Sequence, residues 1–235
     1  MLVLICLSLL AGVITTVAGM GGGLVLLLGL SFFIDPLVAL MTTGPALLIG
    51  NLHRVMLYRE HVRRPLAWRL VLGAAPGALL GGLVAVALPD VMLRSAMVVL
   101  AVLATAKVVL GVRFTPPANA LVPGGAAIGF VTATSGGGGL ISGPLLLASG
   151  LSGRPYVATG AVAAATVHVF RLTGYGAAGS LNGTILLMGL VGAICIATGN
   201  LMGERLRGVI PEEVVPRLEV AVVLTCLGLA LAGLG

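Results

Sequence analysis

Charged residues are scarce in this chain. Asp, Glu, Lys and Arg make up 9% of its 235 residues, whereas apolar residues make up 59% and the mean hydropathy is +1.19. A water-soluble domain of this length cannot cover its surface with so little charge. The apolar runs are continuous and close to the ~20 residues that a spanning helix needs, which also excludes the short alternating strands of a β-barrel. The composition therefore predicts an all-α polytopic membrane protein embedded in a lipid bilayer.

Residues that carry out chemistry are scarce as well. The sequence lacks the residue patterns of common catalytic sites. It contains no nucleophile with a matching base, no metal-ligand cluster, no paired carboxylates and no phosphate-binding Gly-x-x-x-x-Gly-Lys loop. Most carboxylates fall at predicted helix ends, so no intramembrane acidic pair predicts a proton relay or a sodium cage. The sequence predicts no enzyme, no cofactor, no metal and no ATP-driven pump. Metal-ligand spacing is absent among the cysteines and histidines, which are Cys6, Cys195, Cys226, His53, His61 and His168.

Basic residues are missing from the first eighteen positions. Met1 to Ala18 contain no Lys or Arg, so the charged region that opens a signal peptide is lacking, and we expect this stretch to belong to the mature fold. The net charge of +6 comes from residues in the short loops between apolar segments. This pattern follows the positive-inside rule of membrane proteins and indicates no nucleic-acid partner.

Glycine, in contrast, is abundant and clustered. Gly19-Met20-Gly21-Gly22-Gly23 and Gly136 to Gly139 each interrupt a long apolar run. Glycine costs roughly 1 kcal/mol per residue in a helix against alanine, so each cluster predicts a helix break. Lipid cannot hydrogen-bond the freed backbone groups, and such a break is tolerated only inside protein or at a polar cavity. The clusters therefore indicate a binding site, although glycines that only permit tight helix packing are the alternative.

The two halves of the chain match each other, which predicts an internal duplication. Asn51-x-x-Arg54 aligns with His168-x-x-Arg171 after a small shift in the alignment. The predicted first repeat is 1–115, with a hairpin over 2–34 and helices over 37–57, 66–88 and 91–112. The predicted second repeat is 116–235, with a hairpin over 120–150 and helices over 155–172, 183–203 and 214–234. Pairs 116 residues apart include Thr16 and Thr132, Gly21 and Gly137, and Thr43 and Thr159.

The length of the first segment in each half does not match a whole number of membrane crossings. At 1.5 Å per residue it would form about 50 Å of helix, too long for one crossing of a ~30 Å core and too short for two. A re-entrant hairpin with its glycine tip near the midplane fits this length. If both first segments are hairpins, eleven of the thirteen basic residues lie on one side of the membrane, and the exceptions are Arg94 and Arg171. This topology predicts two inverted repeats of three spanning helices each, with both termini in the periplasm.

These features resemble the sulfite exporter TauE/SafE family, also called the 4-toluene sulfonate uptake permeases. The resemblance rests on the two glycine-rich breaks, on the helices that carry Thr43-Gly44 and Thr159-Gly160, and on the polar helix ends, and it covers essentially the whole chain. It implies a multi-pass protein of the bacterial inner membrane that moves sulfite, sulfonates or related organosulfur anions. It leaves the direction of transport and the coupled ion, a proton or sodium, open.

An anion with three oxygens suits the restarting helices. Their N-termini offer free N–H groups and the positive end of the helix dipole, and inverted hairpins would bracket one anion from opposite sides. Serine at the second tip adds a polar contact. The predicted substrate-binding residues at the two tips are Gly21, Gly22, Gly23, Ser135, Gly137, Gly138 and Gly139.

Further candidates lie on the helices that follow the hairpins. The threonine hydroxyls either donate to the anion or bond their own helix backbone, and the Asn and His side chains either bind substrate or link helices. The arginines either attract anions in a vestibule or anchor the helix by snorkelling. His168 is also the one group near the site suited to proton coupling. These candidates are Thr43, Asn51, Thr159 and His168, with Arg54 and Arg171 as vestibule residues.

The sequence favours a secondary transporter that works by alternating access. An elevator-like movement of the hairpins and their following helices against a Val-, Leu- and Ala-rich scaffold is the expected version, and such a scaffold often forms a homodimer. An anion channel with the same hairpins and a carrier of a non-sulfur organic anion are the alternatives.

Overall fold

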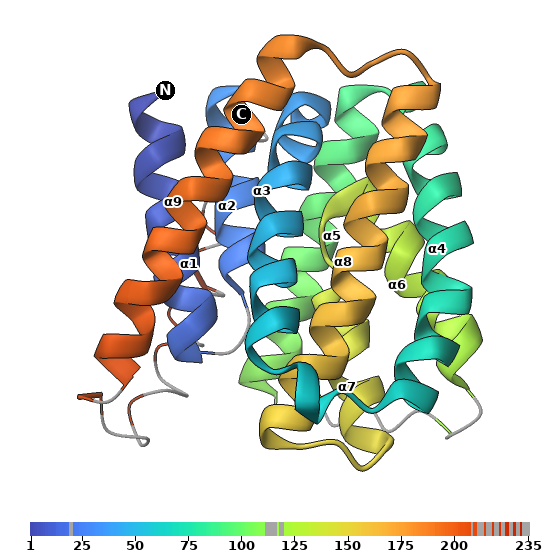
Figure 1. Ribbon diagram of the computed structural model, residues 1–235. Helices are drawn as coiled ribbons and strands as arrows, with labels where there is room; N and C mark the ends of the chain where they lie inside the picture. The colour runs from blue at the N-terminus through green and yellow to red at the C-terminus, as the bar shows by residue number, and fades with distance from the viewer. Residues whose placement is uncertain are drawn as a thin grey trace. The chain divides into compact units, whose positions relative to one another are not determined.

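The computed structural model describes residues 1–18, 21–110, 117, 120–207, 209 and 210, together with single residues of the last segment. This described part is helical, and no strand occurs in it (Figure 1), which confirms the all-α class. The predicted helix 214–234 lies mostly outside the described residues. The α-helices are α1 (Leu2–Ala18), α2 (Gly22–Phe33), α3 (Pro36–Leu57), α4 (Arg64–Ala87), α5 (Asp90–Val109), α6 (Leu121–Ser135), α7 (Gly139–Ala148), α8 (Gly153–Ala177) and α9 (Gly183–Arg207), and η1 (Arg59–His61) is a 3-10 turn.

Both glycine clusters coincide with helix breaks. The first separates α1 from α2, and the second separates α6 from α7. Three helices, α4, α8 and α9, are long and apolar enough to span a membrane, and α1, α2, α6 and α7 are shorter apolar helices. An apolar helix below about 17 residues is too short for a full crossing. The chain is thus a multi-pass membrane protein that also contains shorter apolar helices.

The chain divides into two compact units that do not coincide with its two halves. Unit 1 comprises Met1–Ala46, Pro89–Val112 and Asn182–Gly235, and unit 2 comprises Leu47–Leu88 and Arg113–Leu181. Each unit therefore combines one broken hairpin with a long helix from the other half of the sequence. The inverted, re-entrant arrangement of the repeats stays a prediction.

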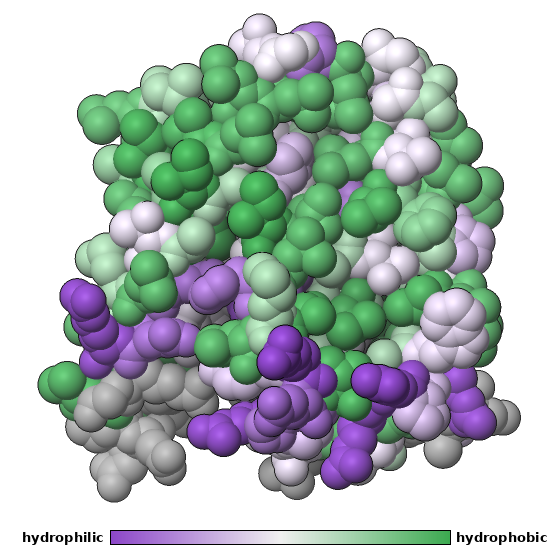
Figure 2. Space-filling view, viewed as in Figure 1, coloured by the Kyte–Doolittle hydropathy of each residue, from purple (hydrophilic) through white to green (hydrophobic). Residues whose placement is uncertain are grey.

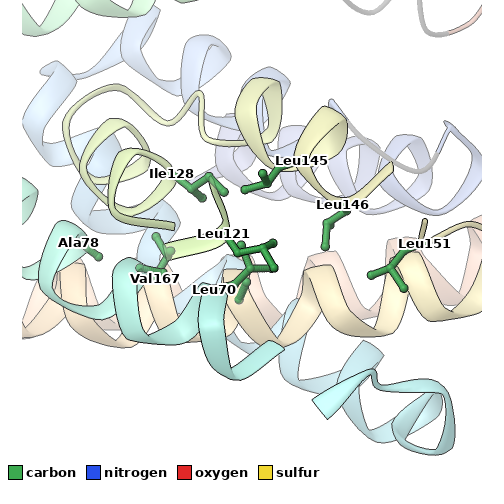
Figure 3. Packing of buried hydrophobic residues seen from close by; sticks show 10 residues of the cluster. Leu70, Ala78, Leu121, Ile128, Leu145, Leu146, Leu151 and Val167 are labelled. Carbon is green, nitrogen blue, oxygen red and sulfur yellow. The ribbon is translucent and has the colours of Figure 1, made fainter. Parts of the chain in front are cut away.

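Unit 2 is built from parallel helices that meet through glycine. A methyl group at Gly73 would lie 2.8 Å from the Ala126 amide nitrogen, and one at Gly81 would lie 2.8 Å from the Phe130 carbonyl oxygen. Because the contacts advance together along both helices, α4 and α6 run in the same direction with their backbones in close approach. Leucines from α4, α6 and α7 meet Val167 of α8 in the adjoining apolar core (Figure 3).

The α6–α7 pair forms a hairpin within this unit. Gly124, early in α6, packs on Leu145, late in α7, and Leu146 packs against Gly160, early in α8. The start of α6 and the end of α7 therefore lie at the same end of unit 2. Where Figure 2 shows that end, near η1 and the start of α4, hydrophilic side chains gather below an apolar helix surface.

Unit 1 repeats the construction with different helices. Gly199 of α9 packs on the backbone at Leu9 and Gly12 of α1, and Gly203 packs on Val13. These contacts again advance together, so α1 and α9 are parallel, as α6 and α4 are in unit 2. In the sequence halves α1 corresponds to α6 and α9 to α4, so the two units use equivalent helices for the same contact.

The predicted helix over 155–172 ends five residues too early. The structure continues α8 to Ala177, through a Gly-Tyr-Gly stretch that the sequence alone marks as a helix end. Gly174 packs against Leu79 and Gly82 of α4, and the Tyr175 hydroxyl bonds α6. Tertiary contacts thus compensate the poor helix propensity of the glycines.

We expect Gly77→Ala to destabilise unit 2, because the added methyl would lie 2.8 Å from the Ala126 carbonyl carbon, where backbone rather than a side chain must move. Overpacking of this kind costs about 1–3 kcal/mol. Thermal unfolding in detergent would measure the loss. Gly183→Ala is the matched control, since nothing lies within 4 Å of its added methyl. Equal melting temperatures for the two variants would contradict the close α4–α6 approach.

Candidate anion-binding site at the helix breaks

The break between α6 and α7 depends on two glycines. Gly136 ends α6 in the left-handed conformation, with φ 76°, and its N–H donates to the Thr132 carbonyl at 3.0 Å. Only glycine adopts this conformation without a steric penalty. A methyl at Gly138 would collide with the Thr132 hydroxyl oxygen and lie 2.9 Å from the Ile128 carbonyl oxygen. The α7 start is therefore pressed directly against the last turns of α6.

The break between α1 and α2 is built in the same way. Gly21 has φ 91°, and a methyl at Gly22 would collide with the Ala11 carbonyl and the Thr15 hydroxyl oxygen. Thr15 donates to the Ala11 carbonyl at 2.7 Å, as Thr132 donates to that of Ile128. Thr15, not the Thr16 that the sequence pairs with Thr132, plays the equivalent part. The two halves thus share a hydroxyl-and-glycine contact that the sequence pairing misses by one residue.

Two side chains of α8 cap the C-terminal carbonyls of α6. Arg171 Nη1 donates to the Thr132 carbonyl at 3.4 Å, and the Tyr175 hydroxyl donates to the Ala133 carbonyl. Arg171 is 1% exposed and Tyr175 is fully buried, and the two side chains are hydrogen-bonded to each other. A cation and a hydroxyl at the negative end of a helix dipole are both favourable. Sequence reasoning missed this capping role for Tyr175.

The N-terminus of α7 keeps unused hydrogen-bond donors. Within the described part of the chain, the N–H groups of Gly137, Gly138 and Gly139 have no acceptor, because the first bonds of the helix are those of Leu140 and Ile141 to the carbonyls of Gly137 and Gly138. A row of free N–H groups at the positive end of a helix is suited to an anion. Arg171 and the Gly136 N–H share one acceptor, so this row begins beside a buried guanidinium.

Positive charge prevails in unit 2, which contains this break. His168, one turn before Arg171 on α8, is 4% exposed, and its Nδ1 has no hydrogen-bond partner among the described residues. The charges of Arg171 and of the half-buried Arg54 both act on its ring. By sequence, unit 2 holds eight arginines and one carboxylate, Glu60, for a net charge of +7. Unit 1 holds five basic residues and six carboxylates, so its net charge is −1.

The other predicted site residues each have a hydrogen bond to a backbone group. Thr159 accepts a hydrogen bond from the Arg63 backbone N–H at 3.1 Å, and it lies twelve residues, about 18 Å, from Arg171 along α8. Asn51 Nδ2 donates to its own helix, at the Leu47 carbonyl, 2.8 Å away. Thr43 likewise bonds the Leu40 carbonyl at 3.0 Å, within unit 1. The buried backbone bonds of these three residues favour a structural role.

The remaining predictions concern the first tip and the arginines. Gly21, Gly22 and Gly23 belong to unit 1, and the N–H groups of Gly22 and Gly23 have no acceptor in the described ranges. The Ser135 hydroxyl turns back to the Val131 carbonyl at 3.0 Å. A vestibule role for Arg54 and Arg171 stays a prediction, although a buried Arg171 is more suited to holding the break. Among the described residues, no cluster of three potential metal ligands occurs.

Short apolar helices broken at paired glycine clusters, together with helices long enough to span a membrane, define a polytopic membrane protein. The chain belongs to the sulfite exporter TauE/SafE family, whose model matches residues 4–231. This is a family of membrane transporters of sulfur anions. Comparison with curated proteins and with solved structures gives no match.

We expect Tyr175→Phe to destabilise the protein, because it leaves the Ala133 carbonyl without its donor inside an apolar environment. An unsatisfied buried acceptor costs about 1–3 kcal/mol. The thermal unfolding midpoint in detergent would report this loss. Tyr58→Phe is the control, since this ring is half-buried at the end of α3 and its hydroxyl makes no recorded bond among the described residues. A wild-type midpoint for Tyr175→Phe would show that the cap contributes nothing.

Proposed function

We propose that this protein is a secondary transporter that moves sulfite or sulfonate-type organosulfur anions across the bacterial inner membrane, with both termini in the periplasm. One observation carries the proposal: the N–H groups of Gly137, Gly138 and Gly139 lack acceptors in the described chain and lie beside the buried Arg171. Family membership supplies the class of substrate. The anion binds at the start of α7.

The donors at this site suit a compact oxyanion that must also be released. Three backbone N–H groups can each meet one oxygen of a sulfite or sulfonate group, and glycine lets that group approach the backbone closely. Arg171 adds long-range attraction, while its own guanidinium is engaged with α6 and Tyr175. Neutral donors with a partly neutralised cation bind an anion without holding it permanently.

Transport follows the alternating-access scheme in its elevator-like form. The hairpins α1–α2 and α6–α7 move together with α3 and α8, against a dimerising scaffold of α4, α5, α9 and the last segment. Glycine lines the contacts of α4 with α6 and of α9 with α1. Such surfaces carry few interlocking side chains, which is compatible with sliding.

A panel of anions tests the site. We expect sulfite, 4-toluenesulfonate, sulfoacetate or taurine to raise the thermal unfolding midpoint of the purified protein, and matched carboxylates to do so less. A ligand present at about 100 Kd adds roughly 2.7 kcal/mol to stability. A flat panel, or equal shifts for the carboxylates, would overturn the assignment of an organosulfur anion.

Two neighbouring glycines provide the matched variants for that panel. Gly138→Ala collides with the Thr132 hydroxyl, whereas nothing lies within 4 Å of a methyl at Gly139. We expect Gly138→Ala to lose the anion-induced shift and Gly139→Ala to retain most of it. Adding Thr132→Ala to Gly138→Ala removes the colliding oxygen and should restore part of the shift. Equal behaviour of the two single variants would place the anion elsewhere.

A reversible crosslink tests the elevator division. A methyl at Gly192 of α9 would lie 3.2 Å from the Ala46 Cβ of α3, close to the 3.5–4.5 Å that a disulfide needs. In a background with the native cysteines replaced by serine, oxidised Ala46→Cys/Gly192→Cys should lose counterflow of labelled anion, and reductant should restore it. Full counterflow in the oxidised form would show that α3 and α9 move as one body. Absence of counterflow in the reduced form as well as in wild type would favour a channel.

A further inference from the structure

The His168 side chain has an unusual environment for a membrane helix. It is 4% exposed, and its Nδ1 has no partner in the described part of the chain. A buried polar atom without a hydrogen bond costs free energy, so a ligand that pairs with this atom would be favoured. A neutral imidazole offers one N–H and one lone pair, and it offers two N–H donors only after it gains a proton.

The charges that face His168 are positive. On its own helix Arg171 lies one turn away, on the same face, and Arg54 of α3 acts on the ring as well. Tyr175 is engaged with Ala133 and Arg171. A proton on His168 therefore adds a third positive charge to this group, and a bound anion compensates that charge.

The elements α4, α6, α7 and η1, which pack against α8, bring no alternative proton carrier to this level, whereas α3, whose Arg54 acts on the ring, also carries His53. Residues 121–148, which form α6 and α7, contain no titratable side chain. On α4, the arginines lie at the start of the helix. Gly82, the α4 residue that faces Arg171, comes thirteen residues after Arg69, about 20 Å further along the helix. Arg63, which follows η1, lies opposite Thr159, about 14 Å along α8 from His168.

We propose that His168 is the proton-coupling residue, so that one proton enters with each anion and leaves with it. Protonation at Nδ1 creates an N–H that donates to an anion oxygen, and the anion in turn stabilises the imidazolium between two guanidinium groups. The coupling is reciprocal, because a proton that favours anion binding is favoured by the anion to the same extent. This inference rests on the proposed anion transport and adds its driving ion.

The experiment uses the full-length protein in liposomes with the membrane potential clamped. We expect wild type to accumulate labelled sulfite or 4-toluenesulfonate about tenfold for each unit of pH gradient, the ratio for one proton per anion. His168→Gln keeps hydrogen-bonding capacity but cannot titrate, so it should lose this accumulation. His61→Gln, on η1, should behave as wild type. The titration of sulfite itself is common to all variants, and a sulfonate does not titrate in this range.

The outcomes separate the two proposals. Absence of wild-type counterflow with either anion overturns the transport function itself. Counterflow without accumulation in wild type, or full accumulation in His168→Gln, overturns only the proton coupling. If His168→Gln loses counterflow, the thermal stabilisation of wild type by 4-toluenesulfonate is measured at several pH values instead. A rise in unfolding midpoint that becomes smaller as pH increases supports the coupling, and a rise that stays constant with pH refutes it.

Discussion

The rest of the structure depends on how backbone groups are satisfied where a helix breaks in an apolar environment. A helix end exposes several N–H or C=O groups, and lipid offers them no partner. At the second break the carbonyls of Thr132 and Ala133 receive donors from Gly136, Arg171 and Tyr175. The N–H groups on the other side of the break have no acceptor in the described chain. The C-terminal carbonyls at the break are thereby satisfied, whereas the N–H groups are the donors that the proposed anion would accept from.

Glycine serves two separate purposes in this arrangement. At Gly136 it supplies a left-handed turn, and along α4 at Gly73 and Gly77 it lets two helix backbones meet. The second purpose holds the hairpin beside a long helix from the other half of the chain. Because α9 holds α1 in the same way, the duplication produces two equivalent supports, and each support joins the two sequence halves. In the proposed alternating-access scheme, the same kind of helix contact could then change in both repeats.

Much of the fold could be predicted from the sequence, because hydropathy and glycine placement are local signals. The breaks at both glycine clusters and the bounds of α4 and α9 follow from them within a few residues. The extension of α8 through Tyr175 could not, since it depends on a hydroxyl that meets Ala133, forty-two residues away. The roles of Thr43, Asn51 and Thr159 could not be chosen either. A polar side chain in an apolar helix has the same pattern whether it bonds a ligand or the backbone, and only the structure shows the backbone partners.

Charge explains why the second break, more than any other feature of unit 2, suits an anion. Unit 2 has one carboxylate, on the exposed η1, against eight arginines, and α6 and α7 have no charged residue at all. Burying the Arg171 guanidinium is costly, and the carbonyl ends of α6 compensate it only in part, because a helix terminus carries about half an elementary charge. The α7 N-terminus adds positive potential to the same place. An anion would compensate the guanidinium and the helix N-terminus together, so the proposed substrate would also complete the electrostatics of this part of the fold.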